Sequence, residues 1–141
     1  MKKYLFTLLF FLTLQANAHH SFSAEFDAKA PVNLKGKVTK VELINPHAWI
    51  PIQTQSPGKS VQNWMFECGS PNILLRSGIN RNTLKVGTEI NVRGYQSKDH
   101  SCKPVCKASG RDITLSDGKT IFTGSTGTDE PQDGLDPSKS K

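Results

Sequence analysis

The sequence predicts an all-β domain with one short helix, folded as an OB-like, five- to six-stranded, partly open β-barrel. Three observations predict this class: short segments of alternating apolar residues, a first strand that bends, and a helix between the third and fourth strands. Three strands, a short helix and then further strands are the order typical of an OB-type barrel. A small antiparallel sandwich is the alternative.

The first three strands follow from the spacing of apolar residues. A long strand is expected over Val32–Leu43, and its apolar phase changes after Val38, which indicates a β-bulge. The pair Asn45-Pro46 predicts a turn before the second strand, and a third strand is expected over Val61–Cys68. The residues expected to point inward from the second and third strands are Ala48, Ile50, Ile52, Trp64, Phe66 and Cys68.

A short helix is expected after Ser70, with Pro71 in its first position and Gly78 at its end. Its buried side is expected to consist of Ile73, Leu74 and Leu75. The strands predicted after this helix are Thr88–Tyr95, Ser109–Leu115 and Thr120–Phe122.

Both ends of the chain are expected to lie outside the barrel. The first residues show the pattern of a secretion signal: a basic start, the apolar run Tyr4–Leu14, and small residues before a cut between Ala18 and His19. The run spans about eleven residues, whereas a membrane-crossing helix needs roughly twenty, so no membrane anchor is expected after cleavage. The mature protein is therefore expected in the periplasm or secreted. The expected division is a signal peptide over 1–18, an extended arm over 19–31, the barrel over 32–122 and a disordered tail over 123–141.

The formal charge of the whole chain is +6. Without Lys2 and Lys3 it is +4, and the tail over 123–141 contributes −2, so residues 19–122 carry +6. A basic body favours acidic partners such as an anionic glycan or an envelope protein, although such a surplus is more often a solvated surface. Nucleic acid is not expected, because export removes the usual targets and few aromatic side chains are available for base stacking.

Three cysteines remain in the expected mature chain. In an oxidising compartment Cys102 and Cys106 are expected to form a disulfide that closes a small loop, with Cys68 as a buried free thiol. Pairing of Cys68 with either of the others and a metal site built from all three thiolates are the alternatives.

Two of the four histidines, His19 and His20, would lie at the new amino terminus. A free α-amine has a pKa near 8, so a metal ion displaces its proton easily. The amine and imidazole of His19, with a second imidazole from His20 or His47, would form a three-nitrogen histidine brace, and such ligands favour Cu(II). Cleavage after Ala16 would also create a Cu(II) chelator. The alternative is a polar arm with solvated histidines.

A second candidate site is the segment Asn45-Pro46-His47-Ala48-Trp49. His47 and Trp49 share one face of the second strand, and Asn45 lies in the adjoining turn. In OB-type barrels the ligand commonly lies on this face and its loops, so Asn45, His47 and Trp49 are the predicted ligand-binding residues. The alternative is structural: Trp49 would cover the barrel mouth and His47 would cap the turn.

No catalytic residue is predicted. The acidic residues Glu25, Asp27, Glu67 and Asp99 are scattered, and the sequence shows neither a phosphate-binding glycine loop nor a convincing nucleophile–base pair. We therefore expect a binding protein and not an enzyme. A hydrolase or an oxidase would require a pocket of converging polar groups that a sequence does not display.

The chain resembles a family of small exported bacterial proteins of unknown function. The matching stretches are His19-His20-Ser21-Phe22, Asn45-Pro46-His47-Ala48-Trp49, Trp64-Met65-Phe66-Glu67, Gly69-Ser70-Pro71-Asn72, Leu84-Lys85-Val86-Gly87-Thr88 and Ile113-Thr114-Leu115-Ser116-Asp117-Gly118. The resemblance extends from His19 to Phe122 and implies a shared fold, but little about activity. The cysteine loop and the acidic tail depart from the family pattern.

The function expected from these observations is that of an exported β-barrel protein that binds Cu(II) through the mature amino terminus. The alternative is an OB-type module that binds an anionic glycan or a partner protein without a metal.

Overall fold

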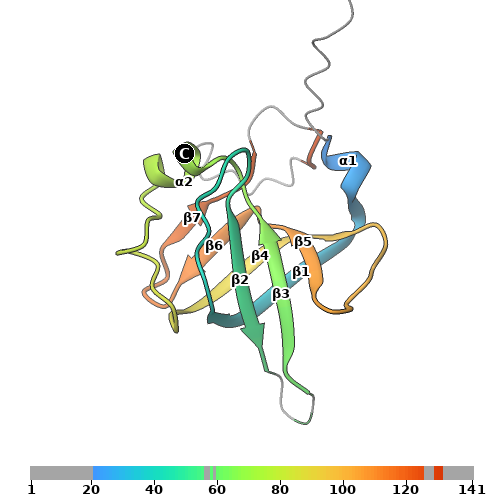
Figure 1. Cartoon of the computed structure of the whole chain (residues 1–141), viewed down its shortest axis with the longest axis horizontal. Helices are drawn as coiled ribbons and strands as arrows, with labels where there is room; N and C mark the ends of the chain where they lie inside the picture. The colour runs from blue at the N-terminus through green and yellow to red at the C-terminus, as the bar shows by residue number, and fades with distance from the viewer. Residues whose placement is uncertain (1–20, 56–57, 59, 126–128, 132–141) are drawn as a thin grey trace, which may run out of the picture.

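The computed structural model describes residues 21–55, 58, 60–125 and 129–131. Two short helices and seven strands make up this part of the chain (Figure 1). The helices are α1 (Phe22–Glu25) and α2 (Pro71–Arg76). The strands are β1 (Phe26–Val38), β2 (Trp49–Thr54), β3 (Gln62–Glu67), β4 (Glu89–Ser97), β5 (Cys106–Ser109), β6 (Asp112–Leu115) and β7 (Thr120–Phe122).

Five of the strands close into a barrel in the order β1-β2-β3-β5-β4, because β1 also pairs with β4. β3 and β5 run parallel, and the other neighbours in the ring are antiparallel. β6 continues the sheet from β4, and β7 pairs with β6. The mostly-β fold and the helix between β3 and β4 confirm the predicted OB-like class. The barrel is closed, with two outer strands added.

The residues that alternation predicted to point inward from the second and third strands lie in the barrel interior. All six lie in one buried cluster, from Ala48 at 0% to Trp64 at 6% exposure. The rings of Trp64 and Phe66 stack with their centroids 6.1 Å apart. Burial of each large side chain contributes about 1.5–3 kcal/mol, so these residues contribute substantially to the stability of the barrel.

The first strand differs from the prediction at both ends. It begins at Phe26 and ends at Val38, where a strand over Val32–Leu43 was expected. Phe22 and Phe26 pack with Tyr95 in a second buried cluster, and this contact draws most of the expected extended arm into α1 and β1. The register of β1 against β4 shifts between Phe26 and Pro31, so the irregularity lies before the predicted position of the bulge.

The expected strand over Ser109–Leu115 is shorter in the structure: β6 covers only Asp112–Leu115, and Ser109 ends a separate strand, β5, which begins at Cys106 and was not predicted. β5 and β6 are separated because the chain passes from β3 to β4 at Gly110 and Arg111. The Gly110 amide donates to the Glu67 carbonyl of β3, and the Arg111 amide donates to the Arg93 carbonyl of β4. β5 therefore lies between β3 and β4, whereas β6 lies between β4 and β7.

The predicted helix forms as α2, but its buried side is narrower than expected. Leu74 is buried, Ile73 is half-buried and Leu75 is 48% exposed, because a helix of six residues turns only a narrow face toward the barrel. Ser70 makes no side-chain capping bond. Gly78 follows the helix with φ +91°, the left-handed conformation that favours glycine.

Part of the expected disordered tail is attached to the barrel. Thr123 is fully buried and its hydroxyl donates to the Gly110 carbonyl at 2.8 Å, and Glu130 is also buried. The Ser23 amide donates to the carboxylate of Asp129 at 3.1 Å, which connects this segment to α1. The attachment is polar, so apolar patterning did not predict it. Residues 126–128, 132–141 and the expected signal peptide lie outside the described residues. No helix among the described residues has the length and apolar character needed to cross a membrane.

Candidate functional site

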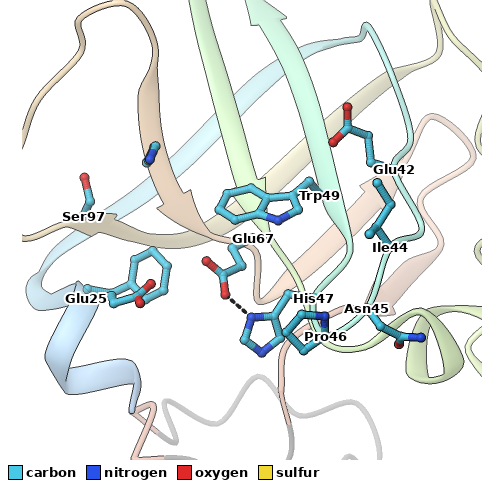
Figure 2. A pocket seen from close by; sticks show the side chains of 11 residues that line it. Glu25, Glu42, Ile44, Asn45, Pro46, His47, Trp49, Glu67 and Ser97 are labelled. Carbon is cyan, nitrogen blue, oxygen red and sulfur yellow. Dashed lines mark ion pairs between the residues drawn. The ribbon is translucent and has the colours of Figure 1, made fainter. Parts of the chain in front are cut away.

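An open cleft of about 480 Å³ lies at one end of the barrel, between the β1–β2 loop and the ends of α1, β4 and β5 (Figure 2). It contains all three residues predicted to bind a ligand, Asn45, His47 and Trp49. The location matches the general binding position of OB-type barrels, which combine the second and third strands with adjoining loops. The size lies within the range of small-molecule sites.

The indole of Trp49 lies in the middle of the cleft, with Glu67 and His47 to one side and Glu42 and Ile44 to another (Figure 2). The Trp49 backbone is held on both sides. It exchanges two hydrogen bonds of 2.9 Å with Glu42, and it lies opposite Glu67 in the β2–β3 register. These bonds fix the backbone of Trp49, and its half-buried ring presents an aromatic surface to the cleft.

The Nδ1 atom of His47 contacts the carboxylate of Glu67 (Figure 2). The backbone is fixed directly after each of the two residues, since the Ala48 amide donates to the Gly69 carbonyl and the Cys68 amide donates to the Ala48 carbonyl. A carboxylate oxygen accepts, so Nδ1 is the donor and Nε2 points away from Glu67. The side chains of His47 and Glu67 are 26% and 12% exposed, which leaves the imidazole partly open to the solvent.

The role of Glu67 was not predicted. In the sequence Glu67 is one of several scattered carboxylates, whereas in the structure it lies beside His47, at the end of the neighbouring strand. The pairing follows from the register of β2 and β3, in which Glu67 lies directly opposite Trp49. The alternation that places Phe66 inside the barrel also turns Glu67 to the other face, and this was the available signal.

The walls of the cleft carry more acidic than basic side chains. Glu25 at the end of α1, Glu42 and Glu67 line it, and Lys107 from β5 contributes a positive charge. Glu42 is itself ion-paired with Lys40. The positive charge expected for residues 19–122 is therefore not concentrated here.

The predicted metal ligands are only partly placed by the structure. His47 lies in the cleft, whereas His19 and His20 are outside the described residues. Within the described part of the chain, no group of three or more histidine, cysteine, aspartate or glutamate residues could hold a metal ion. His47 would therefore need nitrogen ligands from elsewhere to bind one.

The predicted disulfide between Cys102 and Cys106 is present, in the connection between β4 and β5. Cys68 is a free, buried thiol, also as predicted. Burial raises the pKa of the Cys68 thiol from 9.0 to about 12, so it is not a reactive thiolate at neutral pH. These findings favour a structural role for the cysteines and do not support a site built from three thiolates.

Comparison with curated proteins found no match to the chain. A family model, described as a family of unknown function (DUF6152), matches residues 8–105. The match begins before the expected start of the resemblance at His19, and it ends at Val105, short of Phe122. It includes Asn45, His47, Trp49 and Glu67, but not β5 to β7. Since the match covers more than half of the length of the chain, the chain belongs to DUF6152, a family of unknown function.

Proposed function

We propose that the protein is an exported binding protein that holds Cu(II) at the cleft, through His47 and the amino terminus created by cleavage before His19. The observation that carries this proposal is the contact between His47 Nδ1 and the carboxylate of Glu67. Histidines that ligate metals almost always donate their other ring N–H to a carboxylate, a carbonyl or water, which fixes the tautomer and the ring orientation. In the neutral ring, Nε2 would then carry the lone pair that binds the metal.

The amino terminus would complete the ligand set. Cleavage before His19 would leave only two residues ahead of Ser21, which precedes α1, and α1 ends at the cleft with Glu25. The α-amine and imidazole of His19 with Nε2 of His47 make three nitrogen ligands, and nitrogen ligands in near-square geometry favour Cu(II). His20 is the other source of the second imidazole. A protein of this kind would carry or buffer copper and would not turn over a substrate.

The test begins with protein expressed through its own signal and sequenced at its amino terminus. Metal-free protein is then titrated with Cu(II), and the EPR spectrum is recorded. One residue added before His19 should abolish the nitrogen signature of the brace. His47→Ala should weaken Cu(II) binding by more than tenfold, and Glu67→Gln by about tenfold, as expected for the loss of a supporting carboxylate.

His100→Ala provides the matched control, because His100 also pairs with a carboxylate, Asp27 at 3.1 Å, but does not line the cleft. Its Cu(II) affinity should equal that of the unaltered protein. Unchanged affinity and spectrum in the amino-terminal extension would overturn the proposal. Retention of residues 1–18, or trimming beyond His20, would overturn it as well.

A further inference from the structure

We infer that the cleft recognises a pyranose sugar through Trp49, and specifically an amino sugar whose amine is unsubstituted. This inference does not depend on copper, because it uses only residues that the structure describes. The positive overall charge favours an anionic glycan, whereas the acidic side chains that line the cleft favour a cationic sugar.

The first feature that favours a sugar is the aromatic surface of Trp49. Its indole is half-buried in an open cleft, and backbone bonds to Glu42 fix its strand. Indole presents a large rigid apolar surface at a small cost in conformational entropy. The C–H groups of a pyranose form an apolar face of matching shape, while its hydroxyl groups project from the rim. A ring that stacks on Trp49 would therefore turn its polar edge to the cleft walls.

The second feature is the set of hydrogen-bond acceptors in the cleft walls, which are already oriented. Glu67 is held by His47, and Glu42 is held by Lys40. An ionised carboxylate has about four lone-pair sites, so a carboxylate that already binds a protein group can accept further hydrogen bonds from a ligand. The matching ligand is rich in donors, which describes a sugar that carries hydroxyl and ammonium groups.

The charge of the walls selects among sugars. Glu25, Glu42 and Glu67 outnumber the two lysines, Lys107 in the wall and Lys40 behind Glu42. A cationic ring gains from these carboxylates and from the face of Trp49, which attracts cations. A uronic acid would place a second carboxylate among them and would be repelled. The expected preference is therefore an amino sugar first, a neutral sugar second and an acidic sugar last.

The test uses the mature chain with one residue added before His19 and with EDTA present, so that no copper brace forms. Glucosamine tetramer, cellotetraose and tetragalacturonate are titrated separately, and the two indole N–H signals are followed by NMR. Only the signal of Trp49 should shift, because Trp64 is 6% exposed inside the barrel. Trp49→Ala should weaken binding by about tenfold, the size expected for loss of a good aromatic contact.

Glu67→Gln and Glu42→Gln should each reduce the preference for the glucosamine tetramer over cellotetraose. Glu89→Gln is the matched control, because Glu89 pairs with Lys35 away from this cleft, and it should leave the preference unchanged. Equal or tighter binding of tetragalacturonate would overturn the inference, and so would the absence of a Trp49 shift with every probe. Neither result bears on the copper titration, so the two proposals fail separately.

Discussion

The guanidinium of Arg111 lies 3.2 Å from the carboxylate of Glu130, and the two side chains are only 3% and 4% exposed. Arg111 lies between β5 and β6, whereas Glu130 belongs to the acidic segment that follows the last strand. A Cβ atom added at Gly124 would lie 3.0 Å from the same carboxylate, so the chain around this pair is closely packed. The segment around Glu130 is thus part of the folded domain.

Glu130→Ala should destabilise the protein strongly. Removal of Glu130 takes the carboxylate away from the buried guanidinium of Arg111, and the loss of one partner of a buried pair costs about 3–5 kcal/mol of unfolding free energy. Urea denaturation of both proteins measures the difference. The control is Glu89→Gln in the exposed pair with Lys35, where the side chains of Lys35 and Glu89 are 70% and 49% exposed. An exposed pair contributes about 1 kcal/mol or less, so equal effects of the two substitutions would contradict the prediction.

Gly94→Ala should also destabilise the barrel, for a steric reason. A Cβ atom at Gly94 would lie 1.8 Å from the backbone oxygen of Ser109, across the contact between β4 and β5. Neither backbone can move freely, because the Tyr95 amide also donates to the Ser109 hydroxyl at 3.1 Å. We expect a loss of about 3 kcal/mol, at the upper end of overpacking effects.

The comparison for Gly94 is Gly118→Ala, measured in the same thermal or urea experiment. Gly118 has φ +84° with open space around it. Alanine there would have a strained backbone conformation but no steric clash. That strain costs about 1 kcal/mol. If the Gly94 variant is as stable as the Gly118 variant, β4 and β5 can move apart without the expected loss of unfolding free energy, which would contradict the prediction.

Local sequence predicted the parts of the fold that local patterning determines. Alternation placed Ile50 and Phe66 in the core, and the spacing of Cys102 and Cys106 predicted their disulfide. Contacts between distant residues were not predictable in this way. Glu130 reaches Arg111 by a polar contact that leaves no apolar pattern, so its segment was expected to be disordered.

The candidate site shows the same division. Asn45, His47 and Trp49 were predicted because they are neighbours in the sequence beside an expected turn. Glu67 and Lys107 were missed because β3 and β5 bring them to the cleft. Their positions depend on the pairing of β3 with both β2 and β5, and a one-residue change of register would turn Glu67 to the other face.

Reduction of the Cys102–Cys106 disulfide should lower stability moderately. The closed loop is short, and in the chain-entropy model a loop of this size contributes about 2 kcal/mol. β5 starts at Cys106 and has only four residues, so it depends on this constraint more than the longer strands do. The urea midpoint should fall when a reductant is added. A Cys102→Ala/Cys106→Ala variant should already have the lower midpoint and should not respond to the reductant.

The buried thiol of Cys68 should make the stability depend on pH in the alkaline range. Its pKa is raised from 9.0 to about 12, with burial as the largest cause, while the Thr123 side chain acts in the opposite direction. Above pH 9 the thiol of the unfolded chain loses its proton, whereas the folded protein retains it until about pH 12. The unfolded state then binds fewer protons, so the unfolding free energy falls as the pH rises.

The contribution of Cys68 can be separated from those of the lysines and tyrosines by comparison with Cys68→Ala. That variant is less stable at neutral pH because it leaves a small cavity, but it lacks the thiol titration. From about pH 8 to about pH 10.5, the unaltered protein should lose about 2 kcal/mol more unfolding free energy than the variant does. Urea denaturation at each pH measures both curves. Parallel curves would mean that the Cys68 thiol ionises as easily in the folded protein as in the unfolded chain, which is incompatible with its burial.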